Sequence, residues 1–295
     1  MTPDLIILED ELTRLTLAPA IGGSLVNWTV RRNGQALLRP SDAQAIASAS
    51  PRRLAGYPLA PWSNRIAQGG FAGPDGWLAL APNSPNDPLP IHGSAWQQPW
   101  QVLEQSPTQI TLHLDCQVPF AYRAVQRVLL NRGRLEMHLQ VTHQDVRAAW
   151  HGLGWHPYFP RTAHTRLQAP ARHLWQADDG HLSTGLGLLP KIWDFSEPKH
   201  LPAQQVDHAF GGWNGECRII QADAGYQLIC RGTGTEHYLL YCPPAQSFFC
   251  FEPVTHPVNA HHLPGHPGLQ LLRQGQSAEL GFTLQYQPLG TDAAG

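Results

Sequence analysis

The feature that most constrains the fold is a two-residue alternation of apolar and polar side chains, which recurs along the chain. Leu135, Met137, Leu139 and Val141 alternate with polar residues, and the same pattern covers 110–114 and 280–286. Each run predicts a half-buried β-strand, because successive side chains of a strand point to opposite faces. No long amphipathic helix is apparent. Further strands are expected over residues 12–17, 24–31, 100–104, 217–222, 226–230 and 238–242.

The connections favour one domain of stacked antiparallel sheets. Asn131-Arg132-Gly133 joins two strand runs and is typical of a hairpin turn. Residues 79–90 and 190–207 are expected to be irregular, but strand patterns resume directly after each. We therefore predict a single all-β domain over residues 1–290 and a frayed tail at residues 291–295.

Composition argues against several classes of partner. Only 14% of residues are charged, the net charge is −2 and no basic run occurs, so no nucleic-acid partner is expected. The N-terminus lacks a basic segment followed by an apolar one, and no apolar run is long enough to cross a bilayer. We expect a cytoplasmic protein with no membrane partner, either a monomer or a dimer.

The five cysteines do not indicate a protein held together by disulfide bonds. Their number is odd and no CxxC pair occurs, so a disulfide framework is not the favoured interpretation. Cys242 and Cys250 lie in apolar runs and are expected to pack as small hydrophobic residues.

Three short signatures each carry an ionisable residue where a strand would meet a loop: Ile91-His92-Gly93, Trp155-His156-Pro157 and Phe251-Glu252-Pro253. An ionisable group at the end of an apolar strand is costly unless it is paired or exposed, which favours a functional role for Glu252. Two histidines and a carboxylate suit acid–base chemistry. A fourth signature, Pro61-Trp62-Ser63-Asn64-Arg65-Ile66, adds a planar guanidinium.

Together with Val206-Asp207-His208, these signatures resemble, in the same order, those of the aldose 1-epimerase (galactose mutarotase) family. The resemblance spans nearly the whole chain. It implies a large antiparallel β-sandwich, an isomerase that interconverts the α and β anomers of an aldohexose or related sugar, and no metal or organic cofactor. It makes Glu252 the general base and His156 the general acid. Substrate-binding roles are expected for Arg65, His92, Asp207 and Asn64.

The implied reaction opens the sugar ring at its hemiacetal. A base takes the proton of the anomeric hydroxyl O1 while an acid protonates the ring oxygen, and we expect the two groups on opposite sides of the sugar. Burial would raise the pKa of Glu252 and make it a better base. His156 must be protonated, so a nearby carboxylate or solvent is expected. Sugar stacking is expected of Trp62, Trp96 or Trp155.

The chain also departs from galactose mutarotases. Trp155 and Pro157 flank the acid histidine where those enzymes tend to have Asn and Thr, and Pro253-Val254 follows the base in place of Thr-Gln. These differences indicate a divergent branch and leave the preferred sugar open.

The same residues are compatible with several alternative functions. A variant acting on hexose 6-phosphates needs further Arg or Lys at the site, and the sequence places none besides Arg65. A non-catalytic sugar-binding module would not need Glu252 and His156. A glycoside-cleaving enzyme needs two carboxylates, which only Glu252 and Asp207 offer. His92 and Asp207 also fit turn positions. A zinc interpretation of His256, His261, His262 and His266 lacks cysteine or helical spacing.

Overall fold

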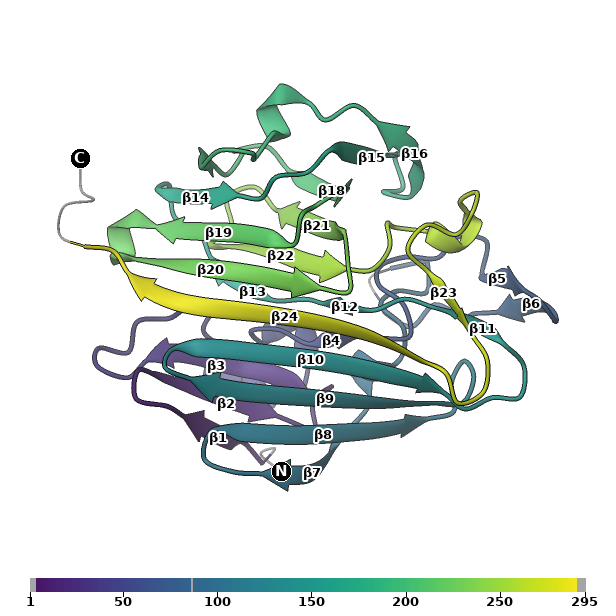
Figure 1. Ribbon diagram of the computed structural model, residues 1–295, viewed down its shortest axis with the longest axis horizontal. Coiled ribbons are helices and arrows are strands. Elements are labelled where there is room, and N and C mark those ends of the chain that lie inside the picture. Colours follow the sequence, from purple (N-terminus) through teal and green to yellow (C-terminus); the bar gives the residue numbers. More distant parts are fainter. Residues whose placement is uncertain (1–3, 86, 291–295) are drawn as a thin grey trace.

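The computed structural model describes residues 4–85 and 87–290, and its regular secondary structure consists almost entirely of antiparallel strands (Figure 1). This confirms the all-β prediction. The predicted frayed tail, residues 291–295, lies outside the described residues. The α-helix α1 (Ala43–Ala47) is only five residues long, and the side chain of Asp42 caps it.

The larger of two extended sheets has nine strands in the order β17-β14-β19-β20-β24-β10-β9-β8-β7. In Figure 1 it crosses the front of the molecule, with β24 at its centre. Its strands are β7 (Gln101–Gln105), β8 (Gln109–Cys116), β9 (Tyr122–Asn131), β10 (Arg134–His143), β14 (Thr165–Gln168), β17 (Lys199–His200), β19 (Glu216–Gln221), β20 (Tyr226–Thr233) and β24 (Ser277–Pro288).

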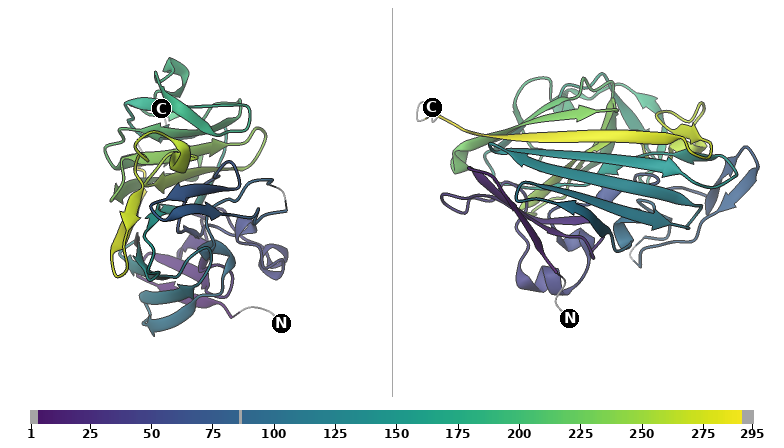
Figure 2. Two further views of the ribbon diagram at one scale, coloured as in Figure 1. Left: turned by 90° about the vertical axis from the view of Figure 1, so that its right-hand side faces the viewer. Right: turned by 60° about the horizontal axis from the view of Figure 1, so that its bottom comes forward.

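The second extended sheet lies behind the first and has the order β16-β15-β18-β21-β22-β12-β4, with β13 also paired to β22 (Figures 1 and 2). This sheet supplies the central strand of the site described below. Its strands are β4 (Pro58–Leu59), β12 (Gly154–Trp155), β13 (Tyr158–Pro160), β15 (His173–Ala177), β16 (Ser183–Gly187), β18 (Val206–Gly211), β21 (His237–Cys242) and β22 (Phe248–Val254).

Within the described residues, three small sheets and five short 3-10 helices complete the fold. The small sheets are β1 (Ile6–Glu9), β2 (Thr13–Ala18) and β3 (Ser24–Val30); β5 (Gly70–Gly73) and β6 (Gly76–Ala79); and β11 (Ala149–His151) and β23 (Gln270–Leu272). The 3-10 helices are η1 (Pro51–Arg53), η2 (Ala95–Gln97), η3 (Lys191–Trp193), η4 (Ala222–Ala224) and η5 (Ala260–His262).

The predicted strands all form, with boundaries shifted by a few residues. The hairpin is also confirmed: Arg134 pairs with Asn131, and both Arg132 and Gly133 have positive φ, at 50° and 72°, as the tight two-residue turn requires. The expectation for residues 190–207 needs correction. That segment contains η3 and the short strand β17, which adds an edge to the nine-stranded sheet.

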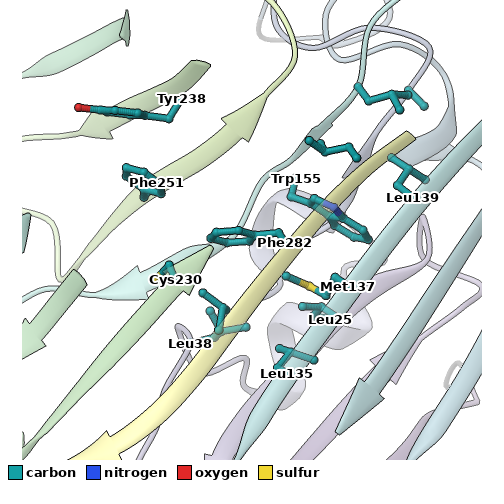
Figure 3. Packing of buried hydrophobic residues seen from close by; sticks show 14 of the residues in the cluster. Leu25, Leu38, Leu135, Met137, Leu139, Trp155, Cys230, Tyr238, Phe251 and Phe282 are labelled. Atoms are coloured by element: carbon teal, nitrogen blue, oxygen red, sulfur yellow. The ribbon is translucent and has the colours of Figure 1, made fainter. Parts of the chain in front are cut away.

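The core lies between the two extended sheets. Phe282 and Cys230 of the nine-stranded sheet face Phe251 and Tyr238 of the other sheet, and Trp155 packs beside Phe282 (Figure 3). The rings of Tyr238 and Phe251 stack with centroids 4.6 Å apart. Because strand side chains alternate, the chain neighbours of Phe251 and Tyr238 must point to the opposite face of the eight-stranded sheet.

The cysteines behave as expected, since all five are buried and free. The directly opposed residues Cys217 and Cys230 of β19 and β20 are not bonded to each other. In the part of the chain that the structure describes, no helix has the length and hydropathy needed to span a membrane.

Candidate active site

A cavity of about 390 Å³ lies on the face of β22 that points away from the core. The predicted site residues Arg65, His92, His156, Asp207 and Glu252 all line it, although they are far apart in the sequence. Asn64 lines it as well. The remaining wall is formed by Arg39, Arg52, Tyr57, Asp87, Ile91, Tyr158, His181, Gln205, Leu239, Tyr241 and Phe248.

Strand register places His156 opposite Glu252. Gly154 of β12 pairs with Val254, and Tyr158 of β13 pairs with Cys250, so the residues midway between them face each other. Pro157 has no N–H and interrupts the ladder there. The backbone N–H of His156 instead donates to the carbonyl of Tyr57, at 3.0 Å. Opposed residues of an antiparallel pair share a face of the sheet, so both side chains enter the cavity.

The two groups are close together and nearly inaccessible. His156 Nε2 lies 3.4 Å from Glu252 Oε1, and the exposed fractions of the two side chains are 9% and 1%. The predicted nearby carboxylate is therefore present. The expectation that acid and base flank the sugar from opposite sides is corrected, because the two groups lie side by side. This arrangement suits two oxygens bonded to the same carbon.

Burial pushes both groups toward their neutral forms. It raises the pKa of Glu252 well above its ordinary value, with a further contribution from Asp207 and an opposing one from Arg65. Burial also lowers the pKa of His156 to about 3, and the charges of Arg52 and Arg39 act in the same direction. The pair therefore holds one exchangeable proton over a wide pH range. Glu252 Oε2 and His156 Nδ1 have no hydrogen-bond partner among the described residues.

Two tyrosine rings hold the imidazole of His156. The Tyr57 and Tyr158 rings stack on it with centroids 4.8 and 4.7 Å away. The centroids of the two tyrosine rings are 6.3 Å apart, so the two rings contact the imidazole from different directions. This packing fixes the plane of the imidazole, as precise proton transfer requires.

Arg65 is oriented by a carboxylate that the sequence did not reveal. Its Nε donates to Asp87 Oδ2 at 2.8 Å, and the exposed fractions of the two side chains are 22% and 7%. The Oδ1 atom of Asn64 accepts from the backbone N–H of Arg65 at 2.9 Å. One edge of the guanidinium is thus engaged within the protein. The rest of the group borders the cavity.

His92 and Asn64, which both line the cavity, are joined by two hydrogen bonds. The backbone N–H of Asn64 donates to His92 Nδ1 at 3.1 Å, and its carbonyl accepts from the backbone N–H of His92 at 3.0 Å. Burial lowers the pKa of His92 well below its ordinary value, so the neutral ring carries its proton on Nε2 and can donate there. The next residue, Gly93, has φ of 66°, and a Cβ there would overlap the Ala60 carbonyl.

Asp207 lies on β18, at the side of the cavity where Arg65 is found. Its pKa is raised by burial, while Arg65 and His181 oppose the rise. The His181 ring lies close to it, with Nδ1 3.9 Å from Asp207 Oδ2. The carboxylate thus borders the cavity with its oxygens accessible to a polar ligand.

The three tryptophans expected to stack on a sugar do not line this cavity, and that expectation is corrected. Trp155 and Trp62 are 1% and 3% exposed and belong to the main core. Trp155 precedes His156 in an extended chain, so the two side chains point to opposite faces. Trp96 stacks behind Tyr57 with centroids 5.5 Å apart. The aromatic wall is instead formed by Tyr57, Tyr158, Tyr241 and Phe248.

Two groups bear on the question of metal binding. In the histidine-rich segment, His256 accepts from the Ser63 N–H at Nε2 and contacts the Pro257 carbonyl through Nδ1, so both nitrogens are engaged. His156, Cys250 and Glu252 place one potential ligand atom each within 4.8 Å of one another. Burial raises the pKa of the Cys250 thiol well above its ordinary value, which disfavours the thiolate that a metal would need.

Known proteins match this chain along most of its length. The family model for aldose 1-epimerase matches residues 4–285. The uncharacterised protein YphB of Escherichia coli K12 is 32% identical over 266 residues, covering 87% of this chain and 90% of YphB.

Solved structures agree with this. The crystal structure of a proposed aldose 1-epimerase from Escherichia coli K12 superposes with a TM-score of 0.91 and 30% identity, covering 97% of this chain and 99% of that one. Galactose 1-epimerase from Lactobacillus acidophilus has the same fold at 16% identity, with a TM-score of 0.80 and 97% and 95% of the two chains covered. With the signatures in order and the cavity assembled from them, this chain belongs to the aldose 1-epimerase family.

Proposed function

We propose that the protein is an aldose 1-epimerase, a mutarotase that interconverts the α and β anomers of an aldohexose or a related sugar. The observation that carries the proposal is the pair formed by His156 and Glu252, 3.4 Å apart at the buried end of a cavity that would hold one pyranose. The two oxygens that must exchange protons, O1 and the ring oxygen, are both bonded to the anomeric carbon. One adjacent acid–base pair can therefore reach both.

Ring opening begins with Glu252 ionised and His156 protonated. The carboxylate takes the O1 proton while the imidazolium protonates the ring oxygen, and the bond between the anomeric carbon and the ring oxygen breaks. The products are the open-chain aldehyde, a neutral Glu252 and a neutral His156. Burial favours this neutral form of the pair.

Ring closure runs the same transfers backwards after the aldehyde has rotated. Glu252 returns its proton to O1, and His156 takes the proton of the hydroxyl that attacks the carbonyl carbon. The pair ends in its starting state with the anomeric configuration inverted. The pair carries one proton before and after each step, because one member takes a proton from the sugar as the other gives one to it, so no external acid or base is required.

The other cavity residues would hold the sugar. Arg65 and the Nε2–H of His92 are donors, and Asp207 is an acceptor for hydroxyl groups. Because Arg65 Nε donates to Asp87 Oδ2 and its Nη1 donates to Asn64 Oδ1 at 3.4 Å, the remaining N–H groups of the guanidinium are oriented before the sugar arrives. These contacts act on both ground and transition states and should mainly affect binding.

The test is the rate at which anomers equilibrate across a panel of aldoses. Freshly dissolved α-glucose, α-galactose and their neutral and charged relatives are followed by NMR with and without the protein. We expect at least one sugar to equilibrate far faster than it does in buffer alone. Binding of these sugars without acceleration would favour a non-catalytic binding module. Release of nitrophenol from nitrophenyl glycosides would favour glycoside cleavage by Glu252 and Asp207.

A further inference from the structure

We propose that the preferred substrate is an aldose with an anionic group on C6, and that Arg52, assisted by Arg39, binds that group. The inference rests on the proposed function, because it takes the anomeric carbon to lie at His156 and Glu252. The sequence signatures place no cation at the site besides Arg65, whereas Arg39 and Arg52 also line the cavity.

Charge is unevenly distributed around the cavity. On one side Arg65 is neutralised by Asp87, and Asp207 lies close enough to influence both. On the other side Arg39 and Arg52 form no ion pair with any described residue. Two uncompensated guanidinium groups at one end of a sugar-sized cavity create a local positive potential, which neutral hydroxyl groups do not require.

The two arginines lie beyond the tyrosines that hold His156. The Arg39 guanidinium lies 3.6 Å from the Tyr158 ring centroid, and the Arg52 guanidinium lies 5.1 Å from the ring centroid of Trp96, which stacks on Tyr57. Both arginines also influence the pKa of His156, so their charges are near the imidazole. The basic end of the cavity is therefore the His156 end.

The chemistry of a pyranose then selects C6. In the proposed mechanism His156 exchanges a proton with the ring oxygen. That oxygen is bonded to two carbons, the anomeric carbon and C5, and C5 carries C6. A group on C6 therefore extends from the His156 side of the sugar toward the arginines. The hydroxyl on C2 adjoins the anomeric carbon on the other side, toward Glu252, Asp207 and Arg65.

Arg52 is the better placed of the two to bind an anion. Nη2 of Arg39 already donates to the carbonyls of Arg52 and Leu54. The Arg52 side chain is half-buried and makes no hydrogen bond to another described residue. It also borders a second cavity of about 350 Å³, lined in part by Trp96 and Gln97. Its five donors thus have space for a carboxylate, sulfonate or phosphate.

The experiment compares kcat/KM for mutarotation of glucose, glucuronic acid, glucose 6-sulfonate and glucose 6-phosphate. The three charged sugars separate the possible sources of the anion. We expect at least one to exceed glucose by about tenfold, with a preference that falls as salt is added. Arg52→Gln should lower the ratio of that charged sugar to glucose by about tenfold or more. Arg53→Gln is the matched control, because Arg53 is exposed in the same turn, outside the cavity, and should leave the ratio unchanged.

Two results would overturn the inference while leaving the proposed function intact. One is glucose being turned over as efficiently as every charged sugar, and the other is Arg52→Gln lowering all rates equally. If no sugar is accelerated at all, the proposed function fails, and calorimetry on the wild-type protein then decides the charge preference. Tighter binding of a charged sugar than of glucose would support the preference for an anionic group on C6, and equal or weaker binding would refute that preference.

Discussion

The ion pair between Arg65 and Asp87 should be worth more than an exposed pair of the same length. Its Nε–Oδ2 distance is 2.8 Å, with exposed fractions of 22% and 7%. Arg231 and Glu216 form a pair at 2.7 Å whose exposed fractions are 67% and 59%. The two ion pairs therefore have similar distances between their charged atoms but differ in how deeply they are buried.

The structure sets the expected magnitudes. Exposed pairs contribute roughly 0–1 kcal/mol, so Glu216→Gln should lower the free energy of unfolding by about 0.5 kcal/mol. Removing one partner of a fully buried pair costs roughly 3–5 kcal/mol. Because Arg65 borders an open cavity and keeps some contact with water, we expect about 2 kcal/mol for Asp87→Asn, an intermediate value.

The Asp87→Asn variant should lose activity as well as stability. Without Asp87 the guanidinium loses its fixed orientation, so Asp87→Asn should raise KM by about tenfold and lower kcat by less. Urea unfolding and mutarotation kinetics measure the two effects, with Glu216→Gln as the control. Equal stability losses in the two variants, or a lower kcat with KM unchanged, would refute the reasoning.

Three further results are expected. The pKa values of His151, His237 and His256 are lowered by burial to about 3, 4 and 4, so each prefers to protonate in the unfolded chain below its ordinary pKa of 6.5. The free energy of unfolding from urea titrations should therefore fall between pH 7 and pH 5, by roughly 2 kcal/mol per histidine, and an unchanged value would contradict their burial. Because burial lowers the pKa of His156 to about 3, kcat/KM should stay within about twofold from pH 7 to pH 5.5 while the protein remains folded, whereas a loss near 6.5 would indicate a solvated imidazole. Activity should survive exhaustive treatment with a chelator, and a loss that zinc restores would instead assign a catalytic metal to His156, Cys250 and Glu252.

Local patterns predicted the strands because each depends on its own alternation of side chains. The hairpin at Arg132 and Gly133 was equally local, since it requires two consecutive residues of positive φ. Sequence signatures predicted His156 and Glu252 as a candidate acid–base pair, and the register of β12, β13 and β22 explains why the two residues meet. Tyr158 follows His156 by two residues in an extended segment, so the same alternation rule could have identified it as a cavity residue.

Other site residues had no signal in the sequence. Arg39, Arg52 and Asp87 lie in loops or a 3-10 turn, and their roles arise only where these segments meet around β22. The choice of tryptophans failed for a different reason. A residue next to a signature need not lie at the site, because Trp155 and His156 occupy opposite faces of one chain segment.

Glu252→Gln tests the central claim most directly, because it keeps the shape of the side chain and removes the oxygen that accepts the proton. Burial already disfavours the charge on Glu252, so the variant should resist urea at least as well as the wild type at pH 8. On the sugar that the wild-type protein accelerates most, we predict that kcat falls by about 10²-fold or more, with the spontaneous rate in the same buffer subtracted. A folded Glu252→Gln protein that equilibrates the anomers at near the wild-type rate would contradict the account.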